Sequence, residues 1–198
     1  MAVITYNFVD ITSPSSTHKC TYNDDYYNPP TGTEVSSENY TAMSTENGTS
    51  YSSPGDDGAT VYARFAVGVS NITKLTPYAK ATAGGYSGEL CYFEIWNFYS
   101  SAWELIAESE TVGLSVLTAD KTPDATHVYV SGGYCYLIID GSSNSYGSAV
   151  TIDYVKLDVT YTASAGSAIK TWNGLADAPV KTSNGLARAS VKTKNGLA

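Results

Sequence analysis

Alternating apolar and polar positions dominate the chain between residues 60 and 161. In Thr60–Val69, apolar side chains occupy every second position, which predicts a strand with one buried face. No helical heptad interrupts this pattern, so the spacing predicts an all-β fold, an antiparallel β-sandwich. The predicted strands are Val3–Ile11, Thr60–Val69, Ile72–Lys80, Glu89–Phe98, Trp103–Ser109, Thr111–Leu117, His127–Val130, Tyr134–Ile139 and Val150–Tyr161.

The same alternation selects the side chains that should form the core. These are Phe65, Val67, Ile95, Leu137, Ile139, Val155 and Leu157. Pro77 marks Ile72–Lys80 as an edge strand or a bulge, because proline has no backbone N–H to donate. Residues 12–59 are polar and rich in turns, so we expect long loops there, little core, and a short strand near Tyr40–Met43.

The last thirty residues repeat with an eleven-residue period. Three units, Ile169–Ala176, Val180–Ala187 and Val191–Ala198, share the pattern Lys-Thr-x-Asn-Gly-Leu-Ala. Asn-Gly favours a tight turn, so each unit should form a hairpin-like turn between short strands. One unit has too little apolar surface to form a core, so the repeats should bind another surface. The expected assembly interface comprises Ile169, Trp172, Leu175, Val180, Leu186, Val191 and Leu197.

Domain boundaries follow from composition and charge. The small residues of 163–168 predict a flexible linker between a domain at 1–162 and the repeat tail at 169–198. The tail carries five basic residues and one acidic residue, whereas the rest of the chain carries six and eighteen. A basic tail on an acidic domain can dock on an acidic neighbour, including another copy, although its lysines can equally serve only to solvate the repeats.

Composition also narrows the partners. An isoelectric point near 4.6 argues against nucleic acid. No apolar run approaches the length that spans a bilayer, so we expect no membrane partner. The first ten residues lack the basic and apolar regions of a secretion signal. A Thr-, Ser- and Tyr-rich composition is typical of surfaces outside the cell, so we expect a location on a virion surface or an extracellular one.

Sequence motifs for catalysis and for metal binding are weak. No nucleophile, metalloprotease or nucleotide-binding motif is present, so we expect no enzyme and no cofactor. Paired carboxylates can hydrolyse a glycosidic bond, and the candidates for such a pair are Glu94, Glu104, Asp140 and Asp153. Glu94 and Glu104 alternate with apolar residues, so we expect both on a solvent face as plain surface charges. The loop pairs Asp24-Asp25 and Asp56-Asp57 leave open a structural calcium ion, although local Asx turns are the favoured role of Asp24, Asp25, Asp56 and Asp57.

Three aromatic residues gather about one predicted hairpin. Trp96, Tyr99 and Trp103 lie at or beside its turn. Exposed aromatic rings on a β-sandwich can stack on sugar rings, so these three are candidates for glycan binding. Trp96 and Trp103 also face each other across the turn, so a cross-strand aromatic pair that packs on itself is the favoured alternative.

Two segments resemble a known class of domain. Glu94–Ile106, with Trp-Asn before the turn and Trp-Glu-Leu-Ile after it, resembles a hairpin of jelly-roll domains. Ile152–Tyr161 is similar to the closing strand of the same domains. The resemblance implies a jelly-roll-like β-sandwich over about 60–161, as in accessory modules of secreted proteins and surface proteins of tailed phages. The terminal repeats resemble short repeats at the ends of phage structural proteins.

These observations support two hypotheses about function. The first is a non-enzymatic structural or decoration protein of a particle or filament exterior, most specifically a capsid decoration or fibre subunit of a tailed-phage virion. Its partners would be copies of itself or a capsid, tail or filament protein, bound through the repeats. The alternative is a carbohydrate-binding module that recognises surface glycans through the Trp96–Trp103 hairpin.

Overall fold

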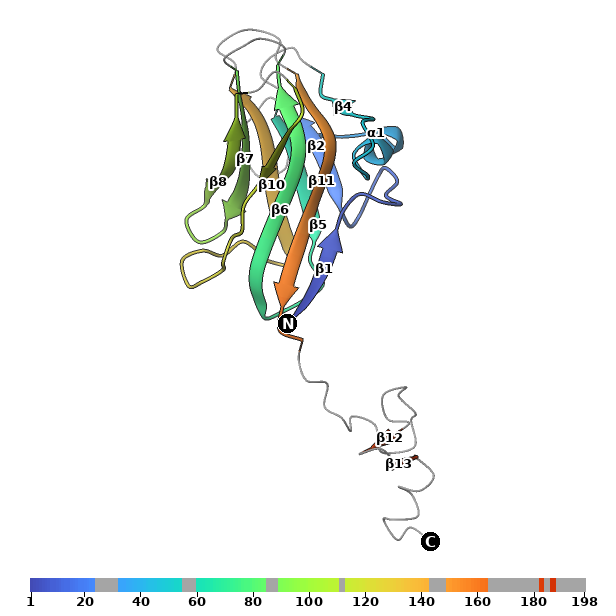
Figure 1. Ribbon diagram of the computed structural model, residues 1–198, viewed down its shortest axis with the longest axis vertical. Helices are drawn as coiled ribbons and strands as arrows, with labels where there is room; N and C mark the ends of the chain where they lie inside the picture. The colour runs from blue at the N-terminus through green and yellow to red at the C-terminus, as the bar shows by residue number, and fades with distance from the viewer. Residues whose placement is uncertain are drawn as a thin grey trace. The chain divides into compact units, whose positions relative to one another are not determined.

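Two antiparallel sheets lie face to face in Met1–Thr162, the first of two compact units of the chain (Figure 1). This computed structural model describes residues 1–23, 32–54, 60–84, 89–110, 113–142, 149–163, 182–183 and 186–187. The first sheet has the order β1-β11-β6-β9, and β4 also pairs with β11. Its strands are β1 (Ala2–Tyr6), β4 (Tyr51–Ser52), β6 (Ile72–Ala83), β9 (Ser115–Thr118) and β11 (Val150–Tyr161).

The second sheet has six strands in the order β3-β2-β5-β10-β7-β8. Its strands are β2 (Lys19–Asn23), β3 (Thr33–Glu34), β5 (Thr60–Ala66), β7 (Leu90–Asn97), β8 (Ala102–Ser109) and β10 (Tyr134–Ser142). Every strand pair in both sheets is antiparallel. The predicted fold class, an all-β antiparallel sandwich, is therefore confirmed.

The hydrophobic core fills the space between the two sheets. All seven predicted core residues are buried, the most exposed being Val67 at 6%. Ile95, Val155 and Leu157 alternate with half-buried residues along β7 and β11, because successive side chains of a strand point to opposite faces. The core side chains could therefore be predicted from the alternation of apolar and polar residues in the sequence.

Residues 12–59 correct two predictions. A short helix, α1 (Ser37–Ala42), replaces the strand expected near Tyr40–Met43. Ser36 caps it, since its side chain accepts a hydrogen bond from the Asn39 N–H. The region also contributes to the core, contrary to expectation, through Cys20, Val35, Tyr40, Met43 and Tyr51. The buried Tyr40 hydroxyl accepts from the Cys20 N–H at 2.8 Å and donates to Glu34 at 2.9 Å, which fixes the helix to the sheet.

Pro77 lies in the interior of the first sheet rather than at an edge, so that prediction is wrong. It belongs to β6, between β11 and β9, and is paired with Leu157. The Leu75 N–H donates to the Lys121 carbonyl, and residues two positions apart direct their N–H groups to the same side. The nitrogen of Pro77 therefore points toward the β9 side of the sheet. It lies between the isolated Leu75–Lys121 bridge and the first β6–β9 pair at Tyr78, so the missing N–H of Pro77 interrupts neither.

The predicted strand His127–Val130 is also wrong. These residues form an irregular connection between β9 and β10. The Val128 N–H donates to the side chain of Asn97, and the Val128 carbonyl accepts from the Phe98 N–H. The connection is therefore held by the end of β7 instead of joining a sheet.

The second compact unit, Ala163–Ala198, contains the repeats. In the middle repeat, β12 (Thr182–Ser183) pairs antiparallel with β13 (Leu186–Ala187). The Asn-Gly pair predicted to form the turn between them lies outside the described residues. The other predicted interface residues, Ile169, Trp172, Leu175, Val180, Val191 and Leu197, lie outside the described residues, and the side chain of Leu186 is not described.

Candidate functional site

Aromatic side chains gather on the outer side of the six-stranded sheet. Ile95 and Leu137 pair within the core, so the residues next to them in sequence point outward. We call this surface the aromatic face; its members are Tyr62, Tyr92, Trp96, Phe98, Trp103, Tyr134 and Tyr136. They come from β5, β7, β8 and β10 and from the residue after β7, so the register of four strands brings them together.

Trp103 lies at the centre of the contacts on the aromatic face. It is paired with Trp96 across the β7–β8 hairpin, with ring centroids 5.1 Å apart in an edge-to-face arrangement. This confirms the expected cross-strand aromatic pair. The Trp103 ring also lies 6.0 Å from that of Tyr62, although two strands separate β8 from β5. Because neighbouring strands are about 4.8 Å apart, the two rings must lean over the sheet toward each other, above Ile138.

This arrangement explains two buried residues on a face that lies outside the core. Ile138 is fully buried and Tyr62 is 1% exposed, yet neither belongs to the core cluster between the sheets. Trp96 and Trp103 remain half-buried. The aromatic face is therefore a second apolar layer, and its large rings retain part of their surface for contact with a ligand. Tyr99, the third residue expected here, is 65% exposed at the tip of the hairpin.

Polar groups lie among the rings of the aromatic face. Arg64 lies 4.8 Å above the ring of Tyr134, and Phe98 contacts Tyr136 at 5.5 Å. Glu94 and Asp140 come from adjacent strands on the same side: Glu94 pairs with Ile138, and Asp140 with Tyr92. Rings beside hydrogen-bonding groups suit a ligand that has both apolar and hydroxylated surfaces.

Asp140 has an unusual electrostatic environment. Burial and, less strongly, the negative charge of Glu94 raise the pKa of Asp140 to about 6, against a hydrogen bond of 2.9 Å from the Thr60 hydroxyl. Burial disfavours the charged carboxylate because it removes water, and a like charge nearby adds to the effect. Ionised Asp140 is therefore held at an energetic cost beside the aromatic rings. Asp140 could be named as a candidate carboxylate from the sequence, but its burial and its proximity to Glu94 depend on the fold.

Glu104 corrects the expectation that Glu94 and Glu104 share a solvent face. Glu104 pairs with the core residue Ile95, so it points to the opposite side of the sheet from Glu94. Its carboxylate accepts hydrogen bonds from Asn97 at 2.6 Å and Tyr129 at 2.7 Å. Burial acts to raise the pKa of Glu104, but these bonds and the nearby charges of Lys121 and His127 lower it overall. These two glutamates therefore cannot flank one glycosidic bond.

Asp153 is likewise separate from the aromatic face. It lies at a β-bulge of β11 in the other sheet, and its side chain is fully buried. It forms an ion pair with Lys80 at 3.1 Å and accepts from the Gly48 N–H at 2.9 Å. These two contacts attach the segment that contains Gly48 to the sheet.

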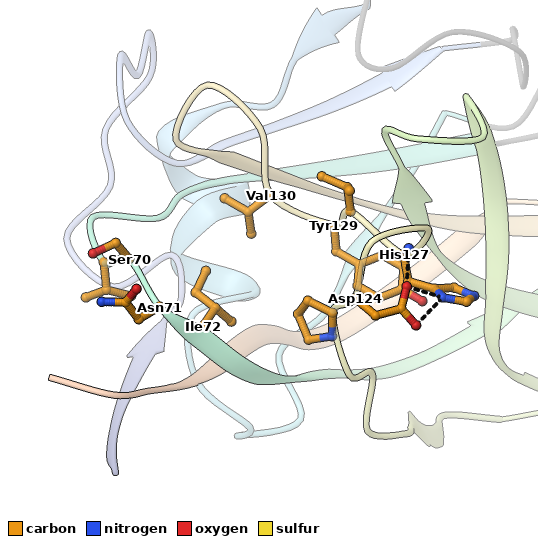
Figure 2. A pocket seen from close by; sticks show the side chains of 10 residues that line it. Ser70, Asn71, Ile72, Asp124, His127, Tyr129 and Val130 are labelled. Atoms are coloured by element: carbon orange, nitrogen blue, oxygen red, sulfur yellow. Dashed lines mark hydrogen bonds and ion pairs between the residues drawn. The ribbon is translucent and has the colours of Figure 1, made fainter.

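A pocket of about 280 Å³ lies between two connections, β5–β6 and β9–β10. Figure 2 shows Ser70, Asn71 and Ile72 on one side of it and Asp124 and His127 on the other. Asp124 accepts a hydrogen bond of 2.9 Å from His127 Nδ1 and one of 2.8 Å from the His127 N–H. This pocket could not be predicted from the sequence, because its two sides come from segments more than fifty residues apart in the chain that meet only in the fold.

The calcium candidates Asp24, Asp25, Asp56 and Asp57 lie outside the described residues. Within the described ranges, no group of three or more His, Cys, Asp or Glu side chains could hold a metal ion. Each cysteine is a buried free thiol, and burial raises its pKa: Cys20, Cys91 and Cys135. Among the described residues, no helix is long and apolar enough to cross a membrane.

The fold and the site define a two-sheet antiparallel β-sandwich domain with an aromatic outer face. Residues 13–161 match the AF_1625_C family, described as "Uncharacterized protein, C-terminal domain". Because this match covers most of the chain, the protein belongs to that family. No curated protein sequence matches the chain.

Solved structures with a similar fold include carbohydrate-binding modules and adhesin domains. A xylan-binding module, CBM15, has 11% identity and a TM-score of 0.47, covering 82% of this chain and 99% of that one. Xylanase 10C from Cellvibrio japonicus, in complex with xylopentaose, has 11% identity and a TM-score of 0.45, covering 82% and 29%. The K2 cleaved adhesin domain of Lys-gingipain has 15% identity and a TM-score of 0.41, covering 81% and 99%.

At such low identity and TM-scores, these similarities say nothing about what this chain binds. Neither the family match nor these three structures assigns the chain to a virion. The choice between functions therefore depends on the geometry of the aromatic face.

Proposed function

We propose that this protein is a non-enzymatic carbohydrate-binding module that holds a glycan chain against the aromatic face. The observation that carries the proposal is the gathering of aromatic side chains on the outside of one sheet, four strands wide. An aromatic ring matches the apolar C–H face of a pyranose, and the neighbouring Arg64, Glu94 and Asp140 can bond its hydroxyl groups. The same proposal places the protein outside the cell, where surface glycans are displayed.

The outer side of the other sheet provides an internal comparison. Its outward positions on β6 include Lys74, Thr76, Lys80 and Thr82, with Tyr78 among them. Tyr78 contacts Tyr154 of β11 at 5.9 Å, which forms an aromatic pair on that side. Since both sheets need only one apolar face to form the core, the second apolar layer on the six-stranded sheet requires a separate reason. Ligand binding supplies that reason.

Asp140 also supports a binding role. Its ionised carboxylate is disfavoured by burial and by Glu94, so it lowers the stability of the fold at neutral pH. A sequence selected only for stability would favour a neutral residue at this position. Groups held at a cost to stability are concentrated at functional sites.

A glycan array tests the proposal. The full chain should bind at least one class of polysaccharide saturably, and soluble oligosaccharide of the same class should compete. Trp103→Ala should lose this binding while its circular dichroism spectrum still shows a folded β protein. Absence of saturable binding to plant, bacterial and algal polysaccharides would contradict the proposal.

The repeats favour a second function, which is attachment to a larger assembly. We propose that 169–198 binds an acidic surface of a neighbouring copy or of a particle protein, as the opposite charges of tail and domain suggest. Sedimentation velocity of the full chain should then show oligomers, which dissociate in about 1 M salt because charge attraction is screened. Removal of 169–198 should leave a monomer. Equal sedimentation of both proteins would contradict self-association through the tail.

A further inference from the structure

Most edges of the two sheets are short or covered. The edge of a sheet carries backbone groups that can pair with a further strand, so proteins commonly shorten it or cover it with charged side chains. The ammonium group of Lys121 donates to the Leu105 carbonyl of β8 at 2.8 Å. Ser109 of β8 donates to Ser115 of β9 at 3.1 Å, so β9 lies against β8. The remaining short edges, β3 and β4, have two residues each.

In the described part of the chain, β1 is an edge strand with neither kind of protection. It has five residues, Ala2–Tyr6, none of them with a charged side chain, and its pairing is with β11 on one side. Figure 1 shows it at the margin of its sheet, next to β11. Val3 is 64% exposed and Ile4 is 36% exposed, so apolar side chains are accessible on both faces of this edge. Such an edge is suited to accept another strand.

A groove of about 430 Å³ borders β1. Its apolar lining comprises Ile4, Tyr6, Val9, Ile11, Ala66 and Val69. Ile4 pairs with the core residue Val159, so it points to the interior side of its sheet, and yet it remains exposed. The groove is therefore an uncovered part of the sandwich interior beside β1. A strand added to β1 directs every second side chain to this side of the sheet.

We propose that β1 is the docking site for a C-terminal repeat of a second copy of this chain. The inference rests on the proposed attachment through the repeats, and it names the surface that receives them. Each repeat starts with a β-branched residue followed by Lys-Thr, as in Val180-Lys-Thr. In the middle repeat, β12 and β13 already pair as antiparallel strands, so a repeat can supply a strand to β1.

The pattern of one repeat matches the two faces of the β1 edge. A strand beside β1 places Val180 over the groove and Lys181 on the outer side of the sheet, because neighbouring residues point to opposite faces. That outer side carries Asp158, which accepts a hydrogen bond from the Thr5 hydroxyl. The overall charges favour the same contact. The repeats carry five basic residues and one acidic residue, whereas the rest of the chain carries six and eighteen.

The course of the chain also favours this occupant. The last strand of the domain ends at Tyr161, which pairs with Ala2, the first residue of β1. When the β1 strands of two copies lie near each other, each tail therefore begins close to the β1 of its partner. Two copies that exchange repeats in this way form a closed dimer. Because every tail has three repeats, a further repeat can bind the β1 of another copy.

Sedimentation velocity of full-chain variants tests the docking site. Val3→Lys should weaken self-association about tenfold or more, because a lysine on the edge blocks strand addition and repels the basic repeats. Val116→Lys is the matched control, since Val116 is 54% exposed on the edge strand β9. It should associate as the wild type does. Both side chains are exposed, so both variants should keep the circular dichroism spectrum of the wild type.

Mixed isotope labelling identifies the contact directly. One copy carries labelled amide nitrogens and the other labelled methyl carbons. Nuclear Overhauser effects should then connect the amides of Ala2–Tyr6 to the methyl groups of Ile169, Val180 or Val191 of the other copy. The inference is wrong if Val3→Lys associates as the wild type does, or if the oligomer lacks these contacts between copies. Oligomers that need the tail but not β1 leave the proposed attachment standing, whereas a full chain that stays monomeric contradicts both.

Discussion

Asp140→Asn is expected to stabilise the protein at pH 7, by about 2–3 kcal/mol. Burial raises the pKa of Asp140 to about 6 in the folded state, above its ordinary value of 3.8. The folded protein therefore binds this proton more tightly than the unfolded chain does, and stability falls as the pH rises from about 4 to 6. Asparagine keeps the shape and the bond to Thr60 but carries no charge.

Urea denaturation at a series of pH values measures this effect. The stability difference between Asp140→Asn and wild type should be near zero at pH 4 and should reach its full size above pH 6. Asp158→Asn is the control, since Asp158 lies at the outer surface of the other sheet and forms an ion pair with Lys156. It should not stabilise the protein. Equal stability of Asp140→Asn and wild type at pH 7 would contradict the electrostatic account of this site.

Trp96→Ala is expected to lower the affinity for a bound polysaccharide about thirtyfold, which corresponds to about 2 kcal/mol for a central aromatic residue of a binding surface. Trp96 is half-buried, so part of its ring is available to a ligand. The fold should tolerate the change better than Trp103→Ala, because Trp103 also reaches across the sheet to Tyr62.

Tyr154→Ala is the matched control for this prediction. It removes one ring of the aromatic pair on the outside of the other sheet. Titration calorimetry with the polysaccharide identified on the array should give unchanged affinity for Tyr154→Ala and weakened affinity for Trp96→Ala. Equal losses in the two variants would mean that binding does not depend on the aromatic face.

Strand positions and core side chains could be predicted from the sequence because both depend on local alternation. Phe65, Ile95 and Leu157 were identified this way and are all buried. The prediction of an edge strand or a bulge at Pro77 was wrong because the position of this proline depends on segments that are distant in the chain. Pro77 occupies a central strand because its missing N–H coincides with a gap in the ladder, and that gap depends on the position of a distant segment.

The candidate site was only half visible in the sequence. Trp96 and Trp103 are close in the chain, so their hairpin could be recognised. Tyr62 and Tyr136 occupy the outward positions of other strands, and their proximity to the hairpin depends on the strand order of the sheet. The alternation along each strand predicts that these tyrosines point outward, but it does not predict the strand order β5-β10-β7-β8 that brings them together. The face assigned to Glu104 failed because Trp103 and Leu105, the apolar residues that flank it, pair with Trp96 and Glu94 on the outer side of the sheet and not in the core.

Residues 12–59 show how polar composition can hide a structural role. Their few apolar side chains are separated by turns, so no period marks them as core. Tyr40 and Met43 nevertheless become fully buried once α1 packs against the sandwich, where Tyr40 contacts Phe8 at 5.1 Å. The burial of these residues comes from tertiary contacts that a local pattern does not contain.

The most direct test of the central claim uses the indole N–H signals of the three tryptophans. Trp96 and Trp103 belong to the aromatic face, whereas Trp172 belongs to the repeat tail. Titration with the polysaccharide, or with a soluble oligosaccharide of it, should shift the Trp96 and Trp103 signals saturably and leave that of Trp172 in place. Saturable binding that leaves the Trp96 and Trp103 signals unmoved would contradict the assignment of glycan binding to this face.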